Sequence, residues 1–185
     1  MLCRSGRRGF DEAFCYGAYE GTLRKLIHLF KYNGMRGLDK PLGNLLAAAM
    51  PRDRQFDAVI PVPLHWRRRW QRGFNQSELL GKVIARRRGI PLVKALRRGA
   101  ATRAQAGLSN AQRRENVAGA FRARRRLAGL RVLLVDDVMT TGATAGACAR
   151  ALKKAGARSV AVLSLARVDR RFTEKADLDK RRGPV

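Results

Sequence analysis

Apolar residues at helical spacing mark two helices in the first fifty residues. Within residues 22–32, four apolar residues follow the i, i+3, i+4 and i+7 spacing of one helical face: Leu23, Leu26, Ile27 and Phe30. The Asn-Gly pair at 33–34 ends this predicted helix. A second helix is predicted over about 38–50, because Pro51 then stops the pattern.

Short apolar runs, separated by turn residues, predict strands in the middle of the chain. Residues 56–60 form one such run and a Pro-Val-Pro sequence closes it, which predicts a buried strand followed by a tight loop. Asn75, with Glu78 three residues on, resembles a capping box that opens a helix. Residues 91–96 are predicted as another strand.

The second half of the chain alternates strand and helix. Residues 132–135 predict the clearest buried strand, a helix follows from about Thr144 to a stop at Gly156, and residues 159–166 predict another strand. This order is that of a parallel-sheet crossover, so the predicted fold class is α/β. Residues 98–116 lack periodicity and predict a long loop, which in a compact domain is usually a functional lid or disordered.

Composition narrows the class of protein. The chain has 185 residues, which suits one domain, and 45% of them are hydrophobic, which excludes a charge-expanded disordered chain. Lys and Arg number 40 against 14 Asp and Glu, a formal net charge of +26. Such a surface favours nucleic acid, phosphorylated metabolites or an anionic membrane face, and the charge alone does not choose among them.

Targeting signals and metal-binding cysteines are not evident in the sequence. No apolar run approaches the roughly 18 to 20 residues that span a bilayer, and the first ten residues carry no apolar signal-peptide core. We therefore expect a cytoplasmic protein with no membrane span. Cys3, Cys15 and Cys148 are odd in number and widely spaced, so we expect reduced thiols and no zinc.

The strongest chemical signal follows the predicted strand at 132–135. Asp136 and Asp137 stand at its carboxyl end, where open α/β sheets place ligands, and their carboxylates suit the vicinal hydroxyls of a ribose. A turn rich in hydroxyls and leading into a helix comes next: Thr140, Thr141, Gly142, Ala143 and Thr144. Such a turn is a cradle for a phosphate monoester. The alternative is that the aspartates cap a turn and the threonines cap the helix.

A second anion site is predicted after the strand at 56–60. The loop there consists of Pro61, Val62, Pro63, Leu64 and His65. Arginines follow it directly and can hold an anionic group by guanidinium forks. His65 can donate a hydrogen bond or shuttle a proton, and we favour the donor role.

The arginines after this loop also suggest a nucleic-acid-binding surface. Trp66 and Trp70 flank Arg67, Arg68 and Arg69, an arrangement that suits single-stranded nucleic acid by stacking and phosphate contact. Residues 66–131 contain seventeen Arg and two Lys against two Glu, a net +17. The alternative for the tryptophans is a helix edge packed on the core, and the alternative for the charge is an arginine-rich genome filling solvated faces.

Four motifs in order resemble those of one family. They are PVPLH from Pro61, RGFNQ from Arg72, QAGLS from Gln105 with RRENVAGAF from Arg113, and VDDVMTTGAT from Val135. Together they are similar to the competence protein F (ComF/GntX) family of phosphoribosyltransferase-like proteins. The similarity extends from Tyr-Glu-Gly at 19–21 and Phe-Lys-Tyr at 30–32 to about residue 167.

The resemblance implies a type I phosphoribosyltransferase-like fold, a twisted parallel sheet flanked by helices. It implies that the catalytic pair Asp136 and Asp137 binds the ribose hydroxyls of phosphoribosyl pyrophosphate (PRPP), that residues 140–144 bind its 5′-phosphate, and that residues 61–65 are the pyrophosphate loop. Mg²⁺ would accompany PRPP. The flap and its basic surroundings would include Arg72, Gln105, Arg113 and Arg114.

The resemblance also implies an organisation and a role. Longer family members carry a four-cysteine zinc module at the N-terminus, so residues 1–21 are interpreted as its remnant without zinc, residues 22–169 as the phosphoribosyltransferase-like domain and residues 170–185 as a charged tail. We expect a phosphoribosyltransferase that binds PRPP or a nucleoside monophosphate and is linked to DNA uptake. The alternative is a single-stranded-DNA-handling or regulatory protein with a non-catalytic pocket, working with competence or recombination proteins. No acceptor-recognition element is identifiable from sequence.

Overall fold

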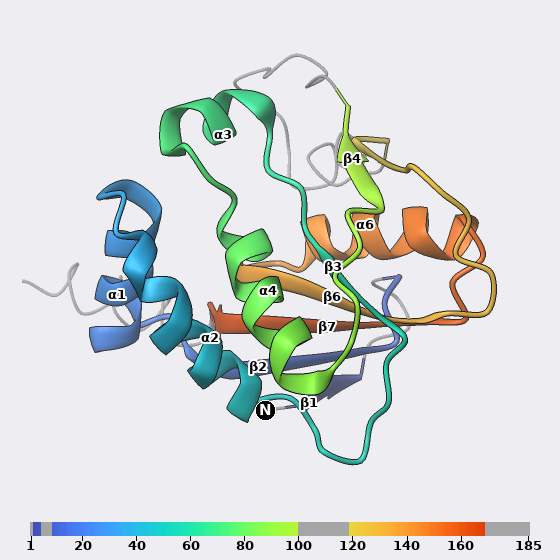
Figure 1. The fold of residues 1–185 in the computed structure, drawn as a ribbon, viewed down its shortest axis with the longest axis horizontal. Coiled ribbons are helices and arrows are strands. Elements are labelled where there is room, and N and C mark those ends of the chain that lie inside the picture. The colour runs from blue at the N-terminus through green and yellow to red at the C-terminus, as the bar shows by residue number, and fades with distance from the viewer. Residues whose placement is uncertain (1, 5–8, 100–118, 169–185) are drawn as a thin grey trace, which may run out of the picture.

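The structure is a computed structural model that describes residues 2–4, 9–99 and 119–168 of the chain (Figure 1). Most of the predicted loop at 98–116, with Gln105, Arg113 and Arg114, lies outside the described residues, as does the predicted tail at 170–185. Within the described ranges, none of the helices has the length and apolarity needed to cross a membrane.

A five-stranded sheet in the order β1-β2-β7-β6-β3 forms the centre of the molecule. Its strands are β1 (Leu2–Arg4), β2 (Glu12–Ala18), β3 (Ala58–Pro61), β6 (Arg131–Met139) and β7 (Ser159–Arg167). β2, β7, β6 and β3 run parallel to one another, and β1 pairs with β2 as an antiparallel edge strand. β6 and β7 are apolar on both faces, as expected for parallel strands covered on each side.

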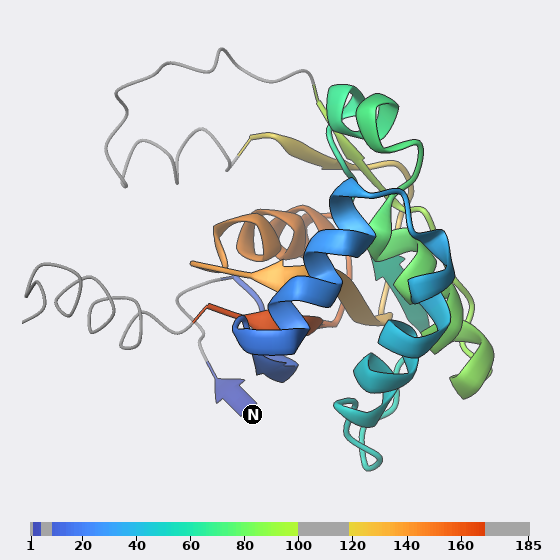
Figure 2. The same cartoon turned by 90° about the vertical axis from the view of Figure 1, so that its left-hand side faces the viewer.

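Helices cover both faces of this sheet (Figure 2). On one side lie α1 (Gly21–Tyr32), α2 (Asp39–Ala48), which follows a short 3₁₀ turn, and α4 (Gln76–Arg88), with a core that includes Phe30, Leu46 and Leu80. On the other side lies α6 (Ala143–Lys154), packed on Val132, Leu134 and their neighbours. α2 crosses α4 closely at Gly43, where a Cβ would lie 2.6 Å from the Cβ of Val83. Only glycine allows this approach.

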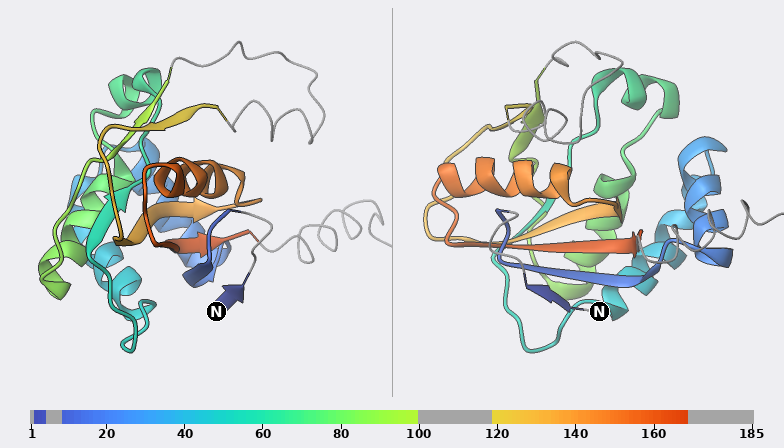
Figure 3. Two further views of the ribbon diagram at one scale, coloured as in Figure 1. Left: turned by 90° about the vertical axis from the view of Figure 1, so that its right-hand side faces the viewer. Right: turned by 180° about the vertical axis from the view of Figure 1, so that it is seen from behind.

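A smaller layer lies over α6, on the side of this helix away from the main sheet (Figure 3). It contains the two-stranded ribbon of β4 (Leu96–Arg98) and β5 (Phe121–Ala123), which are antiparallel. The short helix α3 (Trp66–Arg72) lies between β3 and α4 in the chain, and Figure 1 shows it projecting beyond α4. The long segment outside the described residues connects β4 to β5.

The structure refines several predicted elements. α1, α2, α4, α6 and β7 lie within a few residues of their predicted bounds, and β6 extends the predicted strand at 132–135 through the two aspartates. The strand predicted at 91–96 is wrong: Leu92 makes only an isolated bridge to Val59, and the strand begins at Leu96. β2 was not predicted, and it places part of residues 1–21 inside the main sheet, next to β7.

Candidate functional site

Two adjacent carboxylates stand at the carboxyl end of β6. Because side chains alternate along a strand, Asp137 lies on the face covered by α1, and its Oδ2 is 3.0 Å from Nζ of Lys31. Both side chains of this ion pair are buried for the most part, 15% exposed for Lys31 and 13% for Asp137. Asp137 on β6 therefore forms an ion pair with a cation on a different element, α1.

Asp136 has a different environment from its neighbour. Its Oδ1 accepts hydrogen bonds from Oγ of Ser77, at 3.2 Å, and from the backbone N–H of Asp137, at 2.9 Å. Burial of this carboxyl, and then the nearby charge of Asp137, raise the pKa of Asp136 to about 7. Within the described ranges, no donor bonds to Oδ2 of Asp136 or Oδ1 of Asp137, so each carboxylate keeps one oxygen for a ligand.

The predicted phosphate turn connects β6 to α6. Gly142 has φ +77° and is the N-cap residue of α6, so the chain enters the helix through a conformation that favours glycine. Oγ1 of Thr141 accepts a hydrogen bond from the N–H of Ala143 at 3.3 Å, but the N-cap residue is Gly142 and no side chain in the described part of the chain caps the helix, so the alternative that threonines cap it is wrong. The first backbone N–H groups of a helix attract anions. The turn thus places the N-terminal end of a helix on the same strand–turn–helix unit as the carboxylate pair.

The strand predicted at 56–60 is β3 at Ala58–Pro61, so Pro61 belongs to the strand, paired with Val135, and the predicted loop begins at Val62. This loop lies against the same end of β6. The N–H of Val62 donates to the carbonyl of Val135 at 3.0 Å, and the amide of Asn75 donates to the carbonyl of Val62 at 3.0 Å. Asn75 also caps α4 by accepting from the N–H of Ser77, so the predicted N-cap is confirmed. The loop, the start of α4 and the carboxylate pair are therefore held together.

His65 ends this loop and is the N-cap residue of α3. Its Nε2 is buried without a hydrogen-bond partner among the described residues. Burial, and then the positive charges of Arg98 and the nearby arginines, lower the pKa of His65. A neutral imidazole with one unused ring nitrogen suits hydrogen bonding to a ligand better than it suits a permanent positive charge.

Sequence reasoning did not place Lys31 or Ser77 in the site. Lys31 carried a signal, because it follows Leu23 and Ile27 at i+4 spacing and so stands on the apolar side of its helix. Ser77 follows the N-cap residue Asn75, and local sequence could not show that the hydroxyl faces Asp136. The predicted reciprocal contact of Glu78 in the capping box does not form among the described residues; Glu78 pairs with Lys94 at 2.6 Å instead.

α3 presents its aromatic side chains to solvent. Trp66 is 62% exposed and Trp70 is 87% exposed, and none of the residues of this described helix is buried. The alternative of a helix edge packed on the core is therefore wrong. The guanidinium of Arg67 lies over the ring of Trp66, with Cζ 5.2 Å from the ring centroid.

Cys15 and Cys148 are both buried, and burial raises the pKa of the Cys148 thiol well above its usual value. In the part of the chain that the structure describes, no group of three or more His, Cys, Asp or Glu side chains is arranged to hold a metal ion. The side chain of Cys3 is outside the described set.

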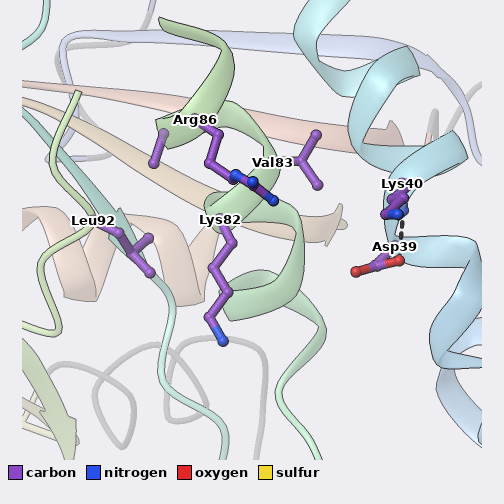
Figure 4. A pocket seen from close by; sticks show the side chains of 7 residues that line it. Asp39, Lys40, Lys82, Val83, Arg86 and Leu92 are labelled. Atoms are coloured by element: carbon purple, nitrogen blue, oxygen red, sulfur yellow. Dashed lines mark hydrogen bonds between the residues drawn. The ribbon is translucent and has the colours of Figure 1, made fainter. Parts of the chain in front are cut away.

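A separate hollow lies between α2 and α4 (Figure 4). Its volume is about 320 Å³, and its lining combines an apolar floor with basic side chains: Asp39, Lys40, Lys82, Val83, Ala85, Arg86 and Leu92. None of the sequence-predicted site residues lines it.

The comparison with known families agrees with this geometry. Residues 75–182, which include the start of α4, the carboxylate pair and the turn at 140–144, match the phosphoribosyl transferase domain family. The chain belongs to this family. Its fold is the type I phosphoribosyltransferase fold, a parallel sheet flanked by helices.

Relatives place the chain more narrowly within the family. Competence protein F of Haemophilus influenzae is 36% identical over 175 residues, which cover 89% of this chain and 76% of the relative. The DNA utilization protein YhgH of Escherichia coli O157:H7 is 36% identical over 156 residues, covering 80% and 69%. The resemblance to the competence protein F family is therefore confirmed.

A solved structure shares the phosphoribosyl transferase fold. The allosteric regulatory enzyme of purine biosynthesis superposes with a TM-score of 0.50 at 27% identity over 70% of this chain. This chain spans only 25% of that enzyme.

Proposed function

We propose that the protein binds PRPP, or a nucleoside 5′-monophosphate, at the carboxyl end of β6 and acts in the cytoplasmic handling of DNA taken up by the cell. The observation that carries the proposal is the carboxylate pair and the helix-opening turn on one strand–turn–helix unit. A ribose phosphate offers hydroxyls to Asp136 and Asp137 and a phosphate to the N–H groups at Gly142 and beyond. No other ligand class uses both halves so directly.

The two carboxylates also fit a ligand that arrives with Mg²⁺. This ion takes oxygen ligands and keeps much of its coordination on substrate phosphates. Oδ2 of Asp136 and Oδ1 of Asp137 are the carboxylate oxygens available near such a complex. Bound Mg²⁺ would neutralise charge on the departing pyrophosphate.

Transferase activity is the chemistry that this pocket favours. A nucleophile would add to C1 of PRPP while the bond from C1 to the pyrophosphate oxygen breaks, pyrophosphate would leave with the electron pair of that bond, and the nucleophile would lose its proton to solvent. The residues here would act by holding the ribose and the phosphates in position rather than by covalent catalysis. His65 would donate a hydrogen bond within the loop at 61–65.

A second function is favoured by the exposed surface of α3. Trp66 and Trp70 offer aromatic faces, and Arg67, Arg68 and Arg69 offer cations, which is the combination that binds single-stranded nucleic acid. The names of the relatives, competence protein F and DNA utilization protein, support a role with DNA. Under this second function, the ribose-phosphate site binds a nucleotide as a sensor and catalyses no transfer. The protein partners would be competence or recombination proteins.

Calorimetry with PRPP and Mg²⁺ tests the pocket. The double variant Asp136→Ala, Asp137→Ala should lose on the order of 2–5 kcal/mol of binding free energy, because charge-assisted hydrogen bonds to the ribose disappear. Asp53→Ala, which removes an exposed carboxylate, is the matched control and should bind like the wild type. Unchanged affinity in the folded double variant would contradict the proposal.

Turnover needs its own measurement. Pyrophosphate release from PRPP, screened with candidate bases and amines, should appear with one acceptor class and disappear in the same double variant. Binding of PRPP without release for any acceptor would favour the non-catalytic pocket.

A further inference from the structure

The proposed ligand raises an electrostatic problem at the site. The turn at 140–144 begins three residues after Asp137, so a phosphorylated ligand there would share one strand–turn–helix unit with two carboxylates. Like charges at short distance repel, and they repel most strongly where water is excluded. A site built for hydroxyls and phosphates together needs a cation to offset the carboxylates.

Lys31 supplies a cation in the required place. Its Nζ lies 3.0 Å from Oδ2 of Asp137, and this side chain is 15% exposed. The helix that carries it is anchored by Ile27 and Phe30, both fully buried. Because a buried ammonium is costly to desolvate, it is retained only where a partner compensates it.

The position of Lys31 in its helix does not by itself explain the burial. A lysine in the last turn of a helix interacts favourably with the helix dipole, and Lys31 is in the last turn of α1. An exposed lysine would serve the dipole equally well, as exposed lysines do on other helix ends. The contact with Asp137 is what distinguishes this residue from Lys25 on the same helix, which is exposed.

We propose that Lys31 is a positioning residue that offsets the charge of Asp137, so that the site accepts phosphorylated ribosides and discriminates them from unphosphorylated ones. This inference rests on the proposed binding of PRPP or a nucleoside monophosphate. Lys31 acts through Asp137: it fixes the carboxylate by one oxygen, leaves the other oxygen for a ribose hydroxyl and reduces the negative potential at the turn.

The test measures the binding of three probes, Mg²⁺–PRPP, AMP and adenosine, to four variants by calorimetry. Lys31→Met should weaken Mg²⁺–PRPP and AMP by roughly 10- to 100-fold, and adenosine by much less. Lys31→Arg should keep affinity within a few-fold, because it restores the charge. Lys25→Met is the matched control, with the same change of net charge on the same helix, and should bind like the wild type.

The double variant Lys31→Met, Asp137→Asn separates charge compensation from direct contact. It removes both charges at once and keeps a side chain of similar shape at each position. No unpaired buried carboxylate is left at residue 137, so this variant also avoids misfolding from that cause. Because Asp137→Asn weakens the ribose contact of AMP and adenosine alike, we expect the double variant to regain the preference for AMP over adenosine that Lys31→Met alone loses.

Several results would overturn the inference while leaving the proposed function standing. They are an equal loss for AMP and adenosine in Lys31→Met, no loss at all in that variant, or a double variant whose preference for AMP over adenosine is as low as that of Lys31→Met. Wild-type protein that binds neither Mg²⁺–PRPP nor AMP would overturn the proposed function itself, and this inference with it. Thermal melting of every variant confirms that the folded state is being compared.

Discussion

The guanidinium of Arg72 lies over the ring of Tyr32, with Cζ 4.8 Å from the ring centroid, and its NH1 donates to Oε1 of Gln76 at 3.4 Å. Lys31, which precedes Tyr32 in the chain, forms the ion pair with Asp137. Ser77, which follows Gln76, donates a hydrogen bond to Asp136. Arg72 therefore connects exposed α3 to both members of the carboxylate pair, once through α1 and once through α4.

Arg72→Ala should weaken nucleotide binding even though Arg72 touches neither carboxylate. Its removal loosens the end of α1 and leaves the fully buried Gln76 without a donor to its Oε1, and we expect a loss on the order of 1–2 kcal/mol in the binding of AMP. Calorimetry measures this loss. Arg69→Ala, on the same helix and exposed, is the matched control, and an equal effect of the two variants would show that only net charge matters.

Stability should depend on pH through Asp57 and Arg131. Oδ1 of Asp57 accepts from NH2 of Arg131 at 2.7 Å, and Oδ2 accepts from its backbone N–H at 2.7 Å. These hydrogen bonds, the side-chain ones first, lower the pKa of Asp57 from 3.8 to about 2. A lowered folded-state pKa gives stability that is present above about pH 4 and is lost as pH falls toward 2.

Asp57→Asn should therefore lower the melting temperature at pH 7 and have a smaller effect in acid. Because the pair is partly exposed, we discount the full shift to about 1 kcal/mol, or roughly 2–4 °C for a chain of this size. Scanning calorimetry at pH 7, 4 and 2.5 should show the difference between variant and wild type shrinking. A constant difference would contradict the assignment, and Asp53→Asn serves as the exposed control.

Gly142→Ala should impair the phosphate turn. A φ of +77° costs an alanine roughly 1 kcal/mol, and the turn can relieve this strain only by moving its N–H groups. We expect both a lower melting temperature and weaker AMP binding. Gly129→Ala is the matched control, because Gly129 has φ +75°, has open space where a Cβ would stand and lies outside the site. It should lose stability and keep its affinity.

Binding to single-stranded oligonucleotides should separate charge from stacking on α3. Reversing Arg67, Arg68 and Arg69 to Glu should flatten the salt dependence, since each neutralised phosphate contributes a log-log slope of about −0.7. Trp66→Ala with Trp70→Ala should instead cost roughly 1–3 kcal/mol per stacked base at an unchanged slope. Fluorescence anisotropy across a salt series measures both quantities.

The control for that experiment lies in the chain that follows β5. Arg124, Arg125 and Arg126 are all exposed, so reversing them changes net charge by the same amount on a different surface. If this variant flattens the slope as much as the α3 variant does, the attraction belongs to the whole basic surface. Wild-type protein without saturable binding at roughly physiological salt would end the nucleic-acid hypothesis.

Sequence reasoning succeeded where the signal was local. The helical spacing before Asn33, the Asn75 cap and the Asp136–Asp137 strand end each depend on neighbours within a few residues, and the structure contains all three. The turn at 140–144 and the helix after it were predictable for the same reason, and the anion binding of this turn stays a prediction. Its glycine and hydroxyls are contiguous in the chain.

Long-range relationships could not be predicted in this way. β2 was missed because its pattern is short and its partner, β7, is nearly 150 residues away. Lys31 and Ser77 reach the carboxylates only after α1 and α4 pack against the sheet, so no spacing in the sequence connects them. The strand predicted at 91–96 failed because a short, mostly apolar run does not show whether a neighbouring strand pairs with it along its whole length.

The pairing of β2 with β7 ties the start of the domain to its end. Glu12 pairs with Ala161 and Ala18 with Arg167, so β2 has no parallel partner until nearly all of the domain has left the ribosome. Contacts between residues so far apart in sequence raise the contact order, which slows folding. During this time β2, a largely apolar strand, is not yet paired with β7. The sheet can therefore be completed only once β7 has been synthesised, and a nascent chain that stalls before β7 leaves β2 without its parallel partner and exposed to chaperones or to aggregation.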